Sequence, residues 1–290
     1  MKPRDFAILV LVCFFWGGNF VVSAWALGNN PVPPFMLATA RAFLVLICLA
    51  PDLLWPLPKS FGLLILICAL IGPVHLGFLY TGLQTASATS SSIVAQLFIP
   101  ISTVLSVVFL RERVGWVRGL AIFGAFAGVI IMILEPSSFQ VELGLIYTLL
   151  AYVSLAAASI LMKKVGEVPW QQFVVWMAVT VFCSSAVTSA IFETGHVTVW
   201  RESKWPLLIT AGFAAIGVSI IAHGQYFNLL KRYDVSQVVP LTLLTPVFAT
   251  VLGVLILGEA ILTRYWIGAA LILPCVYIIA ARSERCTERL

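Results

Sequence analysis

Residues 61–83 read FGLLILICALIGPVHLGFLYTGL and contain no Asp, Glu, Lys or Arg. About 20 apolar residues are enough for a helix to cross the hydrocarbon core of a bilayer, so this stretch predicts a transmembrane helix. A strand of a membrane β-barrel is shorter and alternates apolar with polar residues, whereas this run is continuous. The segment therefore favours an α-helical membrane protein.

Similar stretches fill the rest of the chain. Hydrophobic residues make up 61% of the 290 positions and charged residues 10%, well below the roughly 25% typical of soluble domains. We therefore predict an all-α integral membrane fold, with ten spans in total. The other nine are Phe6–Leu27, Phe35–Pro51, Thr89–Leu110, Trp116–Leu134, Leu143–Met162, Trp170–Phe192, Trp205–Leu230, Val235–Leu257 and Tyr265–Ala281.

The basic residues predict the orientation, because short cytoplasmic loops are enriched in Lys and Arg. With the N-terminus inside, 13 of the 17 Lys and Arg residues fall on the cytoplasmic side. Only Arg201, Lys204 and Arg264 fall outside, and Arg41 lies within a span. We expect a multi-pass protein of the plasma (inner) membrane with both termini cytoplasmic. The net charge of +5 is dispersed over these loops, so it does not indicate a nucleic-acid partner.

An internal repeat divides the spans into two sets of five. A shift of 146 positions places Tyr80 on Tyr226 and Pro100 on Pro246 (226 − 80 = 246 − 100 = 146). We predict one half over residues 1–137 and a second over 141–285. An odd number of spans makes the second half enter from the opposite face, and such inverted repeats around a central cavity are typical of secondary transporters.

The first span contains Phe14-Phe15-Trp16-Gly17-Gly18-Asn19-Phe20. This resembles the W-G-x-N-F signature of EamA-type members of the drug/metabolite transporter superfamily. The resemblance implies a ten-helix bundle around a central cavity that moves amino acids or other small metabolites, most closely the aromatic amino-acid efflux branch. The second half departs from it, with Ala151-Tyr152-Val153-Ser154 in place of a Trp-Gly motif. Further matching positions are Arg41, 86–91, Pro100, 110–113 and Gly258-Glu259.

Polar and aromatic residues near the middle of the spans are the candidates for a substrate cavity. A neutral polar pocket with aromatic walls suits zwitterionic or moderately apolar solutes. Each residue alone could instead be an interface anchor or form a helix–helix hydrogen bond. The predicted cavity residues are Trp16, Asn19, His75, Tyr80, Gln84, Gln96, Tyr152, Trp176, His223 and Tyr226.

Three charged residues invite a structural interpretation. Arg41 lies inside a span and must face protein or water, either as a structural residue or as an anchor for a substrate carboxylate. Glu112 and Glu259 stand just before the fifth and tenth spans, where each could cap the N-terminus of the helix that follows.

Prolines and glycines also have candidate roles. Pro100, Pro240 and Pro246 lie in the fourth and ninth spans and are candidate gate hinges or packing kinks. Each removes a backbone hydrogen bond, so a carbonyl one turn earlier should be free, as at Gln96. In the fifth span, 115–119 and 124–128 form two G-x-x-x-G motifs, which predict close helix packing within the chain or between protomers.

The predicted function is export of small metabolites, with amino acids favoured, by alternating access. The spans contain no mid-membrane Asp or Glu, so facilitated diffusion without an obligate ion is expected. His75 and His223 keep proton-coupled drug or metabolite efflux open as an alternative. A membrane enzyme would need a metal or nucleophile motif, which the sequence lacks, and a scaffold would not explain the repeat. We predict no enzymatic activity, no metal or cofactor, the lipid bilayer as surroundings, and a monomer or homodimer.

Overall fold

The computed structural model describes residues 1–30, 32–55, 60–110, 115–135, 140–162, 164–165, 168–233 and 238–281. Its α-helices are α1 (Pro3–Gly28), α2 (Pro34–Leu49), α3 (Phe61–Ala69), α4 (His75–Gly82), α5 (Ala88–Ala95), α6 (Phe98–Leu110), α7 (Trp116–Ile133), α8 (Leu143–Met162), α9 (Trp170–Phe192), α10 (His196–Glu202), α11 (Lys204–Gly212), α12 (His223–Arg232), α14 (Leu244–Leu252) and α15 (Thr263–Ala281). The other elements are the 3-10 helices η1 (Ala50–Leu54) and η4 (Val239–Leu243), the π-helices η2 (Leu70–Val74), η3 (Phe213–Ala222) and η5 (Gly253–Leu257), and the paired two-residue strands β1 (Leu134–Glu135) and β2 (Gln140–Val141).

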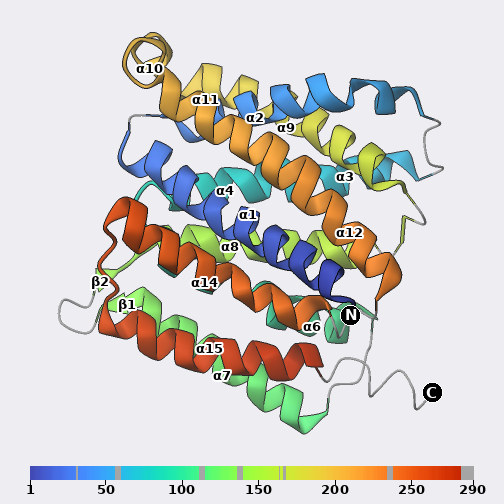
Figure 1. Cartoon of the computed structure of the whole chain (residues 1–290), viewed down its shortest axis with the longest axis vertical. Helices are drawn as coiled ribbons and strands as arrows, with labels where there is room; N and C mark the ends of the chain where they lie inside the picture. Colours follow the sequence, from blue (N-terminus) through green and yellow to red (C-terminus); the bar gives the residue numbers. More distant parts are fainter. Residues whose placement is uncertain are drawn as a thin grey trace.

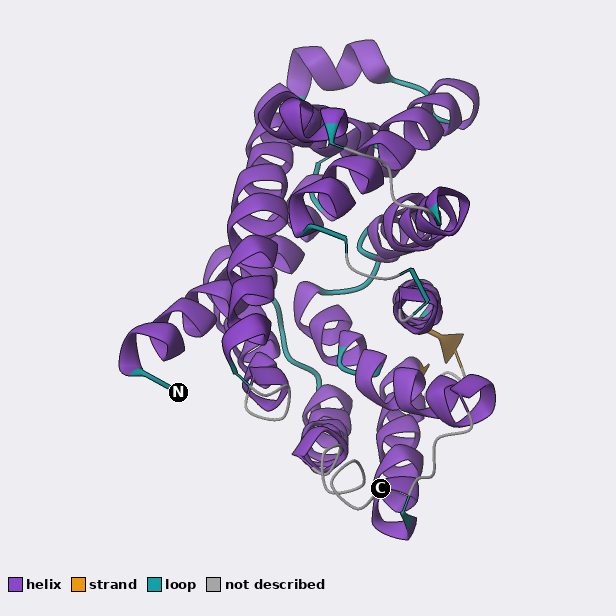
Figure 2. Ribbon diagram, turned by 90° about the vertical axis from the view of Figure 1, so that its right-hand side faces the viewer, coloured by secondary structure: helices purple, strands orange, loops and turns teal. Residues whose placement is uncertain are grey.

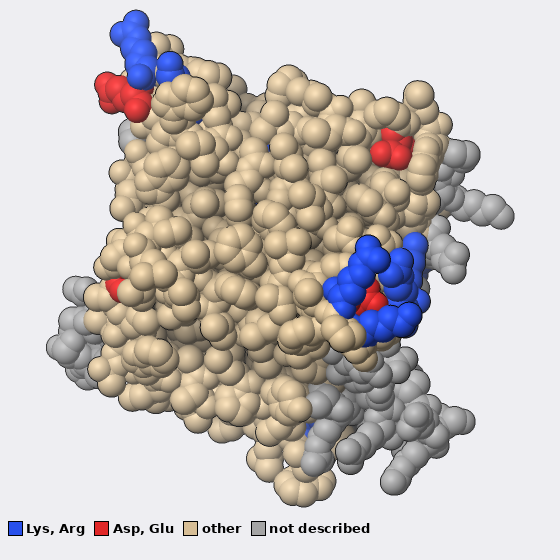
Figure 3. Space-filling model, in the orientation of Figure 1, with Lys and Arg blue, Asp and Glu red and all other residues tan. Residues whose placement is uncertain are grey.

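These elements combine into ten helical stretches that are long and apolar enough to cross a membrane. The predicted all-α membrane fold with ten spans is therefore confirmed. The stretches lie side by side and run between two opposite edges of the bundle, and α1 begins on the same edge at which α15 ends (Figure 1). Seen from that edge, several of the helices are strongly foreshortened (Figure 2). Lys, Arg, Asp and Glu gather toward the edges of the face in Figure 3, and a broad uncharged area lies between them, as a bilayer requires.

Glycines bring several helices into backbone contact. A Cβ at Gly17 of α1 would lie 2.7 Å from the Thr245 carbonyl oxygen and 2.8 Å from the Ala249 nitrogen of α14. A Cβ at Gly144 of α8 would lie 2.7 Å from the carbonyl oxygen of Gly82 in α4. Only residues without a side chain allow helices to approach so closely.

The two G-x-x-x-G motifs of α7 behave differently. Gly124 and Gly128 face α15, where a Cβ on Gly128 would lie 2.8 Å from a side-chain carbon of Ile272. Gly115 and Gly119 have open space around the position of a Cβ. Close packing within the chain is thus confirmed for the second motif only.

The most extensive helix contacts join spans from opposite halves of the sequence. They pair α1 with α14, α2 with α9, α4 with α8 and α7 with α15. Figure 1 shows α1 and α14, from the two ends of the sequence, lying next to each other. The two halves are therefore interleaved.

Spans three and eight each contain a π-helical segment, η2 and η3, and each segment ends directly before a histidine, His75 or His223. Widened turns of this kind are rare and frequent at functional sites. Serine hydroxyls satisfy carbonyls of both segments. Ser154 of α8 donates to the Leu70 carbonyl at 2.9 Å, and Ser219 donates to the Ala214 carbonyl at 3.0 Å.

Spans four and nine are broken near their prolines. Pro100 and Pro246 are each the third residue of α6 and α14, and Pro240 is the second residue of η4. The first-turn N–H groups of a helix have no intrahelical partner, so proline is tolerated at these places. The expectation of a free carbonyl at Gln96 is wrong, because this oxygen accepts a hydrogen bond from the Ile99 N–H at 3.2 Å. Because the span is broken between α5 and α6, the Gln96 carbonyl bonds to the Ile99 N–H and does not need the N–H that Pro100 lacks.

Glu259 caps a helix, but not the one that follows it. Its carboxylate accepts hydrogen bonds from the Ala88 N–H (2.6 Å), the Thr89 N–H (3.1 Å) and the Thr89 hydroxyl (2.6 Å), at the N-terminus of α5. The left-handed backbone of Gly258 (φ 66°) makes the turn that precedes it. The prediction that Glu259 caps the tenth span is therefore wrong, because the helix that it caps is α5. Glu112 lies outside the described residues.

A second carboxylate caps α2 at the same edge of the bundle. Glu193, directly after α9, accepts from the Phe35 N–H at 2.7 Å and the Met36 N–H at 2.9 Å. The Ser189 hydroxyl donates to the same carboxylate at 2.6 Å and lies 2.9 Å from a ring nitrogen of His196. Both acidic caps thus join a helix of the second half to a helix of the first.

Candidate functional site

Aromatic rings from α1 and α12 pack together in the first part of the candidate site. The Trp16 ring lies 4.9 Å from the Tyr226 ring, edge-on, and 5.8 Å from the imidazole of His223. Each of these side chains comes from a helix that a glycine or a π-turn has placed against its neighbour. Three of the predicted cavity residues are therefore brought together.

His75 of α4 and Tyr152 of α8 form the second part of the candidate site. Their rings meet edge-to-face with centroids 5.0 Å apart. The carbonyl oxygen of Ala151 lies 2.9 Å from His75 Nδ1 and can only accept, so Nδ1 carries the proton that is donated. In the neutral ring, Nε2 is then left as an acceptor.

Arg41 connects α4, which carries His75, to η3, which directly precedes His223. Its Nη1 donates to the Tyr80 hydroxyl of α4 at 3.1 Å, and its Nε and Nη2 donate to the Ser219 hydroxyl of η3 at 3.3 and 3.0 Å. Arg41, Tyr80 and Ser219 are buried, and both His75 and His223 lie within electrostatic range of the guanidinium. We call Trp16, Arg41, His75, Tyr80, Tyr152, Ser219, His223 and Tyr226 the central cluster.

Several buried polar atoms beside this cluster have no hydrogen-bond partner among the described residues. They are Trp16 Nε1, His223 Nδ1 and Asn19 Oδ1. A buried polar group without a partner is costly, and native proteins leave few of them. Unused donors and acceptors next to aromatic rings are what a polar solute needs for recognition.

Three predicted cavity residues lie elsewhere. The Trp176 ring packs edge-on against Phe61 at the start of α3, with centroids 4.9 Å apart. Gln96 is buried at the break between α5 and α6. Gln84 follows α4 and lines a cavity of about 410 Å³. None of the three has a ring contact or side-chain hydrogen bond to the central cluster in the described part of the chain.

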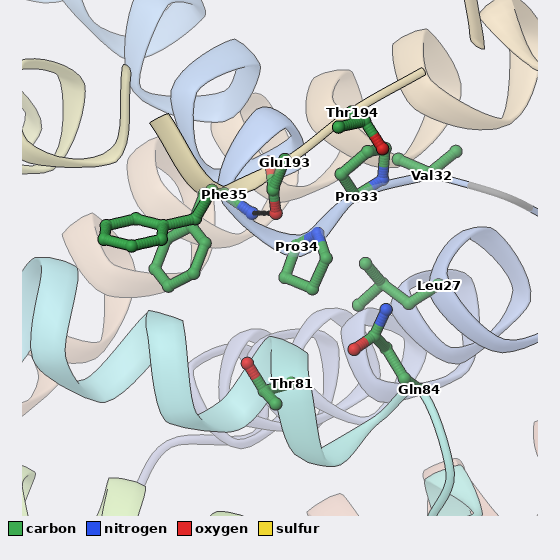
Figure 4. Close-up of a pocket in the computed structure, with 10 residues that line it drawn as sticks. Leu27, Val32, Pro33, Pro34, Phe35, Thr81, Gln84, Glu193 and Thr194 are labelled. Atoms are coloured by element: carbon green, nitrogen blue, oxygen red, sulfur yellow. Dashed lines mark hydrogen bonds between the residues drawn. The ribbon is translucent and has the colours of Figure 1, made fainter. Parts of the chain in front are cut away.

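The cavity that contains Gln84 opens at the edge where the two acidic caps lie. Figure 4 shows Thr81 and Gln84 facing Pro34 across it, with the Glu193 carboxylate on the backbone N–H of Phe35 behind. The cavity thus lies between the ends of α1, α2, α4 and α9.

Sequence reasoning did not identify Ser219. A serine in an apolar span usually bonds its own helix, and Ser219 does so by donating to Ala214. Its spacing of four residues from His223 was the available signal, because such residues share a helix face.

The family follows from the whole length of the chain. The sequence profile of the EamA-like transporter family matches residues 6–134 and again 142–281. The chain belongs to the EamA-like transporter family. It is therefore a multi-pass membrane transporter of the drug/metabolite superfamily, and the resemblance of the first span is confirmed.

Relatives of this EamA-like transporter are similar over nearly their full length. A protein of Escherichia coli named "Probable amino-acid metabolite efflux pump" is 28% identical over 295 residues, which cover 96% of this chain and 95% of the relative. A protein of the same name from Salmonella typhimurium is 27% identical, with the same coverage. A solved crystal structure at 20% identity shares the fold, with a TM-score of 0.63 over 100% of this chain and 99% of the other.

Proposed function

We propose that this EamA-like transporter exports amino acids, or small metabolites close to them, across the plasma (inner) membrane, with both of its termini in the cytoplasm. The observation that carries the proposal is the central cluster. Aromatic rings, neutral polar groups and a single cation meet between helices of both halves, which suits a small solute that has polar and apolar parts. The names of the two bacterial relatives point to the same substrate class.

We further propose that transport proceeds by alternating access around this cluster. In transporters with inverted repeats the substrate binds near the midplane, beside discontinuous helices from both halves. The π-turns before His75 and His223, and the breaks in spans four and nine, support this placement. The glutamate caps and the cavity beside Gln84 lie at the edge that we assign to the outside.

We propose that no coupling ion is obligatory. Proton-coupled exporters use a mid-membrane Asp or Glu that exchanges H⁺ for substrate. Within the described residues, every Asp and Glu lies in a connection or near the end of a span. Export would then run down the concentration gradient of the solute.

Transport by the purified protein in liposomes tests the proposal. We expect the wild type to release at least one of the twenty proteinogenic amino acids from loaded vesicles. Trp16→Ala should lower the rate at least tenfold, because it removes the ring that packs on His223 and Tyr226 and that would contact the solute. Burial of a large apolar side chain contributes roughly 1.5–3 kcal/mol. Trp205→Ala is the control, since this tryptophan is exposed beside Lys204 at the outer end of α11. Wild-type vesicles that release none of the twenty would contradict the function.

A second measurement in the same vesicles concerns the ion. A pH-sensitive dye trapped inside should report no change during amino-acid efflux, and a preset pH difference should not drive the solute uphill. Alkalinisation or acidification in step with the substrate would show proton coupling instead. His75→Gln and His223→Gln would then identify the imidazole that carries the proton.

A further inference from the structure

Arg41 is the only charged side chain in the middle of a span. It is 6% exposed, and its guanidinium donates hydrogen bonds to the hydroxyls of Tyr80 and Ser219. A buried cation in a membrane is costly unless an anion or several acceptors compensate it. The neighbours of Arg41 therefore decide what the guanidinium can bind.

Arg41 does not use all of its hydrogen-bond donors on the described residues. A guanidinium has five N–H donors, of which three are used here, on two neutral oxygens. Within the described part of the chain, two N–H donors have no acceptor, and neither has the hydroxyl hydrogen of Tyr80. The hydroxyl hydrogen of Ser219 is already donated to the Ala214 carbonyl. Three unused donors remain at one buried place.

No carboxylate of the described residues neutralises this charge. The acidic side chains Glu193 and Glu259 are engaged in capping α2 and α5, and Glu142 pairs with Arg264 at 3.0 Å. The unused donors call for an acceptor group that is both anionic and small. A carboxylate meets this need, since its two oxygens accept parallel hydrogen bonds from a guanidinium. A dianionic phosphate would need further cations, and an amine would be repelled.

We propose that Arg41, supported by Tyr80 and Ser219, binds the carboxylate of the transported solute. This rests on the proposed function and narrows its substrate class. The transporter takes zwitterionic amino acids and related monocarboxylates, and it rejects amines and carboxamides of the same size. The aromatic rings of Trp16 and Tyr226 contact the remainder of the solute.

A matched pair of solutes tests this on the unaltered protein. The amino acid that the wild type transports best is compared with its own carboxamide, which differs only in replacing the carboxylate by a neutral group. We expect the carboxamide to be transported at least tenfold more slowly and to compete at least tenfold more weakly. A smaller difference would overturn the inference while leaving export of amino acids intact. Failure of every amino acid to move would instead remove the proposed function.

Variants assign the recognition to Arg41. In Arg41→Gln the ratio of the transport rates of the acid and the carboxamide should fall to about one. Arg41→Lys should restore part of the preference for the acid. Should the glutamine variant elute as aggregate, Tyr80→Phe serves in its place. Loss of its hydroxyl should raise the KM for the acid severalfold and leave the carboxamide unaffected. Tyr277→Phe, at a half-exposed ring of α15, is the control. An unchanged preference in the folded variants would overturn the assignment to Arg41.

Discussion

Replacing Gly17 with leucine should unfold the bundle or leave it poorly assembled. A single Cβ at this position would already lie within 2.8 Å of three α14 atoms, the Thr245 oxygen, the Ala249 nitrogen and the Phe248 Cβ. Two of these are backbone atoms, which no change of rotamer can move. Overpacking of a core costs about 1–3 kcal/mol even where side chains can yield, so we expect more here.

Thermal unfolding in detergent, followed by size-exclusion chromatography, measures this effect. Gly62→Leu is the matched control, because Gly62 is exposed on α3 and has nothing within 4 Å of its Cβ position. The control should elute and unfold like the wild type, whereas Gly17→Leu should aggregate or unfold at a midpoint temperature many degrees lower. Equal behaviour of the two variants would show that α1 and α14 do not approach as closely as described.

Loss of the Glu259 carboxylate should give the second largest effect. In Glu259→Ala the N–H groups of Ala88 and Thr89 and the Thr89 hydroxyl all lose their acceptor. Removal of an N-cap costs about 0.5–2 kcal/mol, and these bonds are made to a charged group, so we expect on the order of 2 kcal/mol. Water should replace part of the lost hydrogen bonding, because Glu259 is only partly buried.

A series at this position separates charge from hydrogen bonding. Glu259→Gln keeps one acceptor oxygen and should lie between the wild type and Glu259→Ala in unfolding midpoint. Glu202→Gln removes an exposed carboxylate at the same edge of the bundle and should change nothing. If Glu259→Ala unfolded at the wild-type temperature, the cap would contribute nothing to the stability of α5.

Hydropathy was sufficient to predict the ten spans, because length and apolar content alone decide whether a helix can cross a bilayer. It could not predict the π-helical segments of spans three and eight, since a run of apolar residues reads the same in α- and π-helical form. The interruptions of spans four and nine were indicated by their prolines and not by hydropathy. The partner of Glu259 was also out of reach, because Ala88 lies 171 positions away in the sequence.

Most members of the central cluster could be picked out one by one from the sequence, but their arrangement could not. Trp16, His75, Tyr80 and His223 stand out as polar or aromatic residues at mid-span, and the structure places Trp16 against His223, His75 against Tyr152 and Tyr80 against Arg41. Gln84 and Trp176 have the same chemistry and lie elsewhere, because composition does not give the depth of a residue or the rotation of its helix. Ser219 acquires its role only from its contact with Arg41.

The interleaving of the helices has a mechanical consequence. Two close backbone crossings, α1 on α14 and α4 on α8, each tie one half of the sequence to the other through glycines. A motion that separated residues 1–137 from 141–285 as two rigid blocks would have to break both crossings at once. Helices joined in this way travel together, so the moving parts of such a transporter must each be assembled from both halves. Its hinges would then be sought in the interrupted spans between these mixed parts and not in the link between the repeats.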